Sequence, residues 1–136
     1  MGLIECQDIC KSFGEKVALD HVSVTMEKGK IFGLLGPNGS GKTTLIRIIN
    51  RITIPNSGVI LFDGRPITQR DVEKIGYMPE ERGLYRKMKV GEQALFLARL
   101  KGMSYKDAET ELKKWFVRFG IESWWNKKVE ELSKGM

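Results

Sequence analysis

A short glycine-rich segment behind an apolar run constrains this chain more than any other feature of its sequence. Residues 36–44 read Gly-Pro-Asn-Gly-Ser-Gly-Lys-Thr-Thr and match the pattern G-x-x-x-x-G-K-[ST]. The apolar residues 31–35 predict a buried strand before this segment, and residues 43–51 predict a helix after it. Glycines let backbone N–H groups turn inward around phosphate oxygens, and the positive end of the following helix attracts the same charge. The segment therefore predicts a phosphate-binding loop.

Two side chains of this loop are expected to have chemical roles. Lys42 is expected to reach the β- and γ-phosphates of a nucleotide as a point charge and to act in catalysis, and the Thr43 hydroxyl is expected to hold Mg²⁺. The predicted nucleotide-binding residues of the loop are Gly36, Pro37, Asn38, Gly39, Ser40, Gly41, Lys42, Thr43 and Thr44.

Length and composition narrow the class of protein. The 136 residues fit one domain, and 41% hydrophobic with 29% charged residues is ordinary globular composition. No apolar run approaches the ~20 residues that span a bilayer, and residues 1–10 lack the apolar stretch of a signal peptide, so a cytosolic or cytosol-facing protein is expected. Cys6, Cys10 and the single His21 are too few for the usual zinc spacing, so no zinc site is expected, and the cysteines are predicted to stay reduced.

The net charge of +6 is concentrated in one segment. Residues 82–101 carry a single acidic residue, Glu92, against the basic residues Arg82, Arg86, Lys87, Lys89, Arg99 and Lys101. Three interpretations stay open at this point: a solvated face, contact with lipid headgroups, or contact with nucleic acid.

The hydrophobic periodicity changes along the chain. Strands are expected at residues 3–10, 17–26, 59–62 and 75–78, with 31–35 and 75–78 as parallel strands buried on both faces. Residues 92–100 predict a helix covered on more than one face, and a second helix is expected between Ser104 as N-cap and Gly120 as C-cap. Its apolar stripe predicts a core position for Trp115. We expect a nucleotide-binding core with an antiparallel β subdomain at 1–81 and a helical subdomain at 82–136.

Beyond the loop, three further segments make the chain resemble the ATP-binding cassette (ABC) family. Phe13 stands where that family places an aromatic side chain that stacks on adenine. Residues 57–64, Ser-Gly-Val-Ile-Leu-Phe-Asp-Gly, resemble its antiparallel strand and turn, and residues 132–136, Leu-Ser-Lys-Gly-Met, resemble its signature motif. The form of the glycine-rich loop is itself typical of the family.

The resemblance implies an α/β fold of the P-loop NTPase class, with an antiparallel β subdomain and a helical subdomain. It implies the ATP-binding subunit of an ABC transporter, using ATP and Mg²⁺ and paired with a second such subunit and with transmembrane permease subunits on the cytoplasmic face of a membrane. In such a pair the signature of one subunit contacts the nucleotide of the other. Ser133 and Gly135 are expected to donate a hydroxyl and a backbone N–H; the signature comprises Leu132, Ser133, Lys134, Gly135 and Met136.

The lid loop and the signature both depart from the family pattern. Glu80 stands where the lid loop usually carries Gln; a carboxylate there can also ligate Mg²⁺ and is expected to join the catalytic site, while pairing with Arg82 at the surface is the alternative. Residues 80–85 resemble the lid loop of bacterial exporter cassettes. In the signature, Lys134 and Met136 replace the commonest Gly and Gln.

The resemblance also implies segments that follow residue 136: a second acidic strand, a catalytic glutamate and a switch histidine. We therefore expect these residues to be the N-terminal portion of a longer protein, truncated before that strand, and inactive as an ATPase alone. The alternative function is a soluble ABC-family ATPase that acts on ribosomes or nucleic acid, although a nucleic-acid partner is not favoured.

Overall fold

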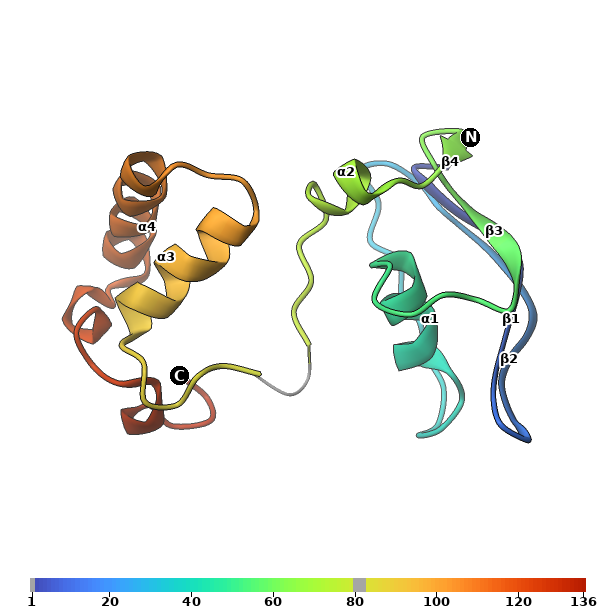
Figure 1. Cartoon of the computed structure of the whole chain (residues 1–136), viewed down its shortest axis with the longest axis horizontal. Coiled ribbons are helices and arrows are strands. Elements are labelled where there is room, and N and C mark those ends of the chain that lie inside the picture. The colour runs from blue at the N-terminus through green and yellow to red at the C-terminus, as the bar shows by residue number, and fades with distance from the viewer. Residues whose placement is uncertain (1, 80–82) are drawn as a thin grey trace. The chain divides into compact units, whose positions relative to one another are not determined.

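The computed structural model describes residues 2–79 and 83–136, and the chain divides into two compact units (Figure 1). The first unit ends at Tyr77 and the second begins at Met78. Each is described by itself below.

An antiparallel sheet dominates the first unit. Its strands are β1 (Ile4–Phe13), β2 (Lys16–Met26), β3 (Ser57–Phe62) and β4 (Arg65–Pro66), in the spatial order β2-β1-β3-β4. The predicted strands at 3–10, 17–26 and 59–62 are thereby confirmed, the first in a longer form. Alternating apolar residues on β2 place Val22, Val24 and Met26 against the core, as the pattern predicted.

One helix, α1 (Lys42–Ile49), covers the buried face of this sheet. Leu45, Ile48 and Ile49 recur at helical spacing and are buried, and they form one cluster with Cys6, Ile9, Leu19 and Ile60 of the sheet. The helix predicted at 43–51 is confirmed, although it ends two residues earlier in a turn. Cys6 lies in this cluster, and burial raises the pKa of its thiol to about 11.

The prediction of buried parallel strands at 31–35 and 75–78 is wrong for this structure. Ile31 is 102% exposed and Leu35 93% exposed, and Met78 is 92% exposed. A strand buried on both faces needs hydrogen-bonding neighbours for its backbone, and among the described residues no strand pairs with either segment. Within these two segments, Leu34 and Ile75 are the residues that pack against the core cluster, so each segment contacts the core through one side chain.

A buried carboxylate ties β4 to the short helix α2 (Gln69–Val72). Arg65 donates to Asp71 through both terminal nitrogens, Nη1 to Oδ2 at 2.8 Å and Nη2 to Oδ1 at 2.7 Å. The backbone N–H and hydroxyl of Thr68 donate to the same carboxylate at 2.8 and 2.6 Å. The hydrogen bonds from Arg65 and then Thr68 hold the pKa of Asp71 well below its usual range.

The second unit is helical. It contains α3 (Val90–Leu100), α4 (Tyr105–Phe119) and two 3₁₀ turns, η1 (Glu122–Trp124) and η2 (Val129–Glu131). The predicted caps of α4 are confirmed: the Ser104 side chain accepts from the Asp107 N–H, and Gly120 adopts the left-handed conformation with φ of 66°. Within the part of the chain that is described, no helix has the length and apolarity to cross a bilayer.

Backbone pairing joins two distant segments of this unit beside α3. Val90 donates to the Lys127 carbonyl, Gly91 to Trp125 and Val129 to Met88, at 2.9 to 3.0 Å. A Cβ on Gly91 would overlap the ring of Trp125, so a side chain at that position would separate the two segments.

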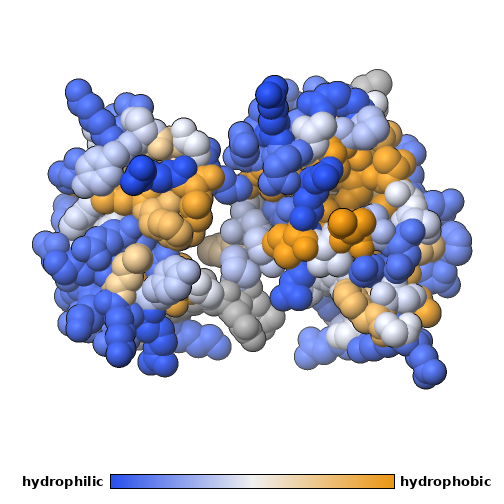
Figure 2. Space-filling view, in the orientation of Figure 1, coloured by the Kyte–Doolittle hydropathy of each residue, from blue (hydrophilic) through white to orange (hydrophobic). Residues whose placement is uncertain are grey.

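Two expectations for these helices are wrong. Phe96, Leu97 and Leu100 are 41%, 44% and 66% exposed, so α3 is covered on one face only. Trp115 is 46% exposed; it stacks on Phe119 at 5.4 Å and lies under the Arg118 guanidinium. Ala108 and Phe116 are the buried residues of α4, because its described packing partners cover only that side. Figure 2 shows apolar side chains reaching the surface of both units.

We predict that Asp71 stabilises the protein most above the ordinary carboxyl pKa. Its pKa is lowered in the folded state, so this contribution is fully present above the unfolded value near 4 and is lost as the pH falls toward the folded value. Replacement Asp71→Asn is expected to lower the melting temperature at neutral pH and to weaken its dependence on pH at acidic pH. Thermal unfolding by circular dichroism across that range measures both effects.

The matched control is Glu73→Gln, which neutralises an exposed carboxylate two residues away. It is expected to leave the melting temperature nearly unchanged. If both variants unfold alike at neutral pH, the Arg65–Asp71–Thr68 group does not stabilise the unit as described.

Candidate functional site

The glycine-rich loop lies between the extended segment 31–35 and α1, and its shape depends on two glycines with positive φ. Gly39 has φ of 81° and Gly41 has φ of 92°, a region that other residues rarely adopt. A Cβ on Gly41 would also overlap the Ala18 carbonyl oxygen and approach Leu19 Cδ2 to 2.8 Å. The beginning of α1 therefore rests directly on β2, and this contact fixes where the loop turns into the helix.

Lys42 folds back over the loop instead of extending into solvent. Its Nζ donates to the Gly36 carbonyl at 2.6 Å, to the Pro37 carbonyl at 2.7 Å and to Ser40 Oγ at 3.2 Å. Three acceptors thus hold one ammonium above the concave side of the loop. An anion entering there meets a positive charge that is already positioned.

The first turn of α1 offers backbone donors at the same place. Its N-cap, Gly41, supplies no side-chain hydrogen bond, and the first backbone bond into the helix runs from the Leu45 N–H to the Gly41 carbonyl at 2.9 Å. The N–H groups of Lys42, Thr43 and Thr44 precede that bond and point out of the helix, as the first N–H groups of any helix do. Thr43 is exposed, so its hydroxyl fits the role of a ligand for a nucleotide-bound cation.

Phe13, the residue predicted to stack on the base, has an exposed ring. It ends β1 at the tip of the β1–β2 hairpin and is 53% exposed, with Lys11 Nζ 5.1 Å from the centre of its ring. In Figure 1 this hairpin tip and the glycine-rich loop lie toward the same end of the first unit. An exposed ring there is available to stack on a base.

The signature residues form a tight turn in the second unit. The Met136 N–H donates to the Ser133 carbonyl at 3.1 Å, and the Ser133 N–H donates to Met136 Sδ at 3.4 Å. Ser133, Lys134 and Gly135 are exposed. The turn adjoins a cavity of about 350 Å³ whose lining includes Leu132 and Lys134.

Arg86 and Leu84 also line this cavity, and the sequence interpretation had not connected them with the signature. The sequence did not reveal this position, because Leu84 belongs to the segment interpreted as a lid loop and Arg86 belongs to the basic segment. The backbone bond from Glu130 N–H to the Arg86 carbonyl, at 2.9 Å, brings that segment beside the signature.

Glu80, predicted to bind Mg²⁺ and to act in catalysis, lies outside the described residues, as do Glu81 and Arg82. Its predicted role, and the alternative pairing with Arg82, remain predictions.

Comparison with known proteins identifies relatives over nearly the whole chain. Residues 19–136 match the family described as ABC transporter. The chain is 47% identical over 133 residues to an uncharacterized ABC transporter ATP-binding protein, YhaQ, of Bacillus subtilis, covering 98% of this chain and 45% of that protein. It is 31% identical over 134 residues to the lantibiotic transport ATP-binding protein SrtF of Streptococcus pyogenes, covering 98% of this chain and 57% of that protein.

Solved structures show the same fold. A structure described as the ATP binding subunit of an ABC transporter superposes with a TM-score of 0.81 at 28% identity, covering 98% of this chain and 57% of that one. The chain thus spans about half the length of the relatives it matches. The fold class expected from the sequence is confirmed.

We predict that Lys42→Ala weakens the binding of MgATP by ~10- to 150-fold, because a charge-assisted hydrogen bond to phosphate contributes ~1.5–3 kcal/mol. Turnover by the full-length protein is expected to be lost. Isothermal titration calorimetry and phosphate release measure the two effects.

The matched control is Lys30→Ala, which removes an exposed lysine ahead of the loop. Equal affinity for MgATP in the Lys42→Ala and Lys30→Ala proteins would contradict the assignment of the loop.

Phe13→Ala is expected to weaken ATP and GTP binding by similar factors, because stacking contributes ~1–3 kcal/mol per base and distinguishes purines poorly. Phe13→Tyr keeps an aromatic ring and is expected to retain the affinity of the original protein. Fluorescent-nucleotide titration compares the three proteins. Unchanged binding in Phe13→Ala would place the base elsewhere.

Proposed function

Because the chain belongs to the ABC transporter family, we propose that it is the ATP-binding and ATP-hydrolysing part of a transporter, and that it drives movement of a substrate through transmembrane partner subunits. The observation that carries this proposal is the Lys42 ammonium, held at 2.6 and 2.7 Å by two carbonyls of the loop beside the open N-terminus of α1.

This arrangement suits phosphoryl transfer. As the γ-phosphoryl group moves to water, negative charge develops on its oxygens, and donors fixed in advance stabilise that charge without reorganising. The N–H groups at the beginning of α1 supply such donors, and Lys42 supplies a positive charge beside them. Lys42 can donate to a phosphate oxygen once one of its hydrogen bonds to Gly36, Pro37 or Ser40 is released. Mg²⁺, when bound, neutralises charge between the β- and γ-phosphates; Thr43 would hold it, and Glu80 is the proposed second protein ligand.

The signature turn is proposed to act on the nucleotide of a second ATP-binding subunit. Ser133 would offer its hydroxyl and Gly135 its backbone N–H to the γ-phosphate held by the partner. The neighbouring positive charges of Lys134 and Arg86, which line the same cavity, would favour an anion there.

The basic segment is proposed to face the membrane and its permease subunits on the cytoplasmic side. The structure pairs Lys89 with Lys128 across an antiparallel bridge, which sets two like charges opposite each other. Lys127 and Lys87 flank that bridge in the sequence and are exposed. An anionic surface, such as lipid headgroups, would relieve this repulsion, and that relief supports a membrane-side position.

Export is the proposed direction of transport. It rests on the sequence of residues 80–85, which resembles the lid loop of bacterial exporters. Within that run Tyr85 is held in place: its backbone N–H donates to Gln93 Oε1 at 2.8 Å, and its ring contacts Phe96 edge to face.

Charge reversal tests the proposed membrane association. In the full-length protein, changing Lys87 and Lys89 to Glu is expected to reduce co-isolation with membranes and permease subunits while leaving ATP binding intact. The matched control reverses Lys113 and Lys114, which are exposed on α4 and paired with Glu109 and Glu111.

Two results would contradict the proposal. One is undiminished membrane association in the variant altered at Lys87 and Lys89. The other is RNA binding by the original protein with a steep dependence on salt and no membrane partner, which would favour a ribosome- or RNA-directed ATPase.

A further inference from the structure

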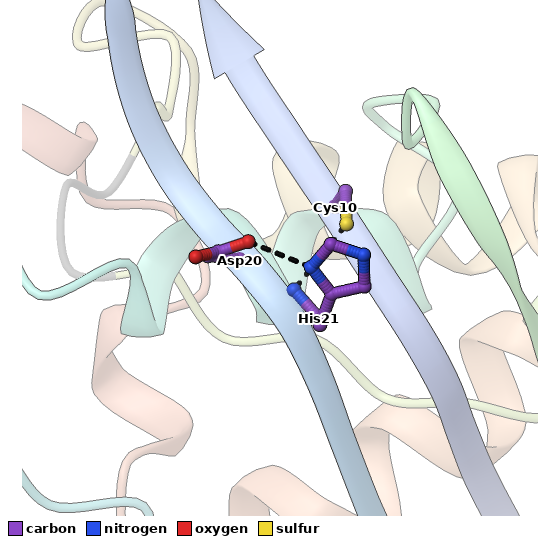
Figure 3. A group of neighbouring side chains, drawn as sticks. All are labelled: Cys10, Asp20 and His21. Atoms are coloured by element: carbon purple, nitrogen blue, oxygen red, sulfur yellow. Dashed lines mark hydrogen bonds and ion pairs between the residues drawn. The ribbon is translucent and has the colours of Figure 1, made fainter.

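On the β1–β2 hairpin, a few residues from its tip, three potential metal ligands of different chemistry come together. Cys10 lies on β1, and Asp20 and His21 lie on β2 (Figure 3). One ligand atom from each, the Cys10 sulfur, an Asp20 carboxylate oxygen and a His21 ring nitrogen, all lie within 4.8 Å of one another. Spacing along the chain, from which no zinc site is expected, does not reveal this group, because pairing across the hairpin brings its members together.

A bulge in the sheet produces this grouping. Ile9 pairs with Val22 and Lys11 with Leu19, so the single residue Cys10 faces both Asp20 and His21. In a regular strand two successive side chains would point to opposite faces, but two residues opposite one is the geometry of a β-bulge. His21 absorbs the irregularity with φ of 48°, an uncommon value for a residue other than glycine.

Hydrogen bonds already orient the three groups. The backbone N–H of His21 donates to Cys10 Sγ at 3.3 Å, and His21 Nδ1 and Asp20 Oδ1 are 2.7 Å apart. These bonds hold the sulfur, the carboxylate and the imidazole close together. The side chains of His21 and Asp20 are 71% and 79% exposed, so a cation can reach them from solvent.

The local charge favours a cation. Asp20 lies against the imidazole, and Asp8 of β1 adds a second negative charge that acts on the same ring. Two carboxylates thus lie at this position in a chain whose overall charge is +6.

We propose that Cys10, Asp20 and His21 form a binding site for a borderline transition-metal cation, with Zn²⁺ as the model ligand. Ligand distances of ~2.0–2.3 Å in a tetrahedral site place donor atoms ~3–4 Å apart, so the Asp20–His21 pair needs to open by only ~1 Å. Three protein ligands leave a fourth position for water or for a donor from another molecule. The site cross-links β1 and β2.

The donor set separates this site from the Mg²⁺ that accompanies a nucleotide. A sulfur and an imidazole nitrogen suit Zn²⁺ or Co²⁺, whereas Mg²⁺ prefers oxygen ligands and octahedral geometry. Binding at the hairpin is therefore independent of nucleotide, of Mg²⁺ and of Lys42, and it can be tested whether or not the proposed transport function holds.

Cobalt titration of the whole chain without nucleotide is the test. Co²⁺ is expected to produce a sulfur-to-metal charge-transfer band that saturates, is displaced by Zn²⁺ and is unaffected by excess Mg²⁺. Cys10→Ala is expected to abolish the band, and Asp20→Asn and His21→Asn to weaken Co²⁺ binding at least tenfold. Asn at position 21 tolerates the positive φ.

Two controls make the result specific. Asp63→Asn alters an exposed aspartate outside the proposed site, whose φ of 50° is close to that of His21. This variant is expected to bind Co²⁺ like the original protein. Lys42→Ala is expected to do the same. Circular dichroism checks that each variant is folded; if Cys10→Ala is not, Asp20→Asn and His21→Asn decide the outcome.

Absence of a charge-transfer band in the original protein would overturn the proposal. So would a band of undiminished strength and affinity in the folded hairpin variants, because the sulfur would then belong to another site. The buried thiol of Cys6 is the other cysteine in the chain.

Discussion

The arrangement of the first unit depends on the contact between Gly41, the N-cap of α1, and the backbone of β2. Gly41 lies so close to the Ala18 carbonyl that no side chain fits, and its φ of 92° turns the chain directly into the helix. Leu45, Ile48 and Ile49 then bury against the sheet and hold α1 in this position. The glycine-rich loop thus leads directly into a helix that hydrophobic packing holds against the sheet.

Electrostatic interactions also contribute to the structure of the glycine-rich loop. The carbonyl oxygens of Gly36 and Pro37 accept hydrogen bonds from the Lys42 ammonium and hold it at the loop. Its positive charge is therefore in place before an anion binds. The beginning of α1 contributes its dipole at the same point. Both contributions would favour an anion at the loop, and the ring of Phe13 is exposed at the tip of the β1–β2 hairpin.

The second unit depends on a different constraint, the pairing of residues 88–91 with residues 125–129. Gly91 permits this pairing because its hydrogen leaves room for the Trp125 ring. The same pairing sets Lys89 opposite Lys128 and brings Arg86 to the cavity beside the signature turn. The pairing of these two segments therefore positions both the basic residues and the residues that surround the signature turn.

The sequence by itself determined the glycine-rich loop, the strands at 17–26 and 59–62 and the caps of α4, because each depends on residues close together in the chain. It also determined the family, because each of the motifs that carry the resemblance is short and local. Tertiary structure decided the rest. Periodicity could not reveal that residues 31–35 lack paired neighbours among the described residues, or that Trp115 lies on the uncovered side of α4, because burial depends on what packs against an element. Nor could spacing along the chain show Cys10 beside Asp20 and His21, since a bulge between two strands brings them together.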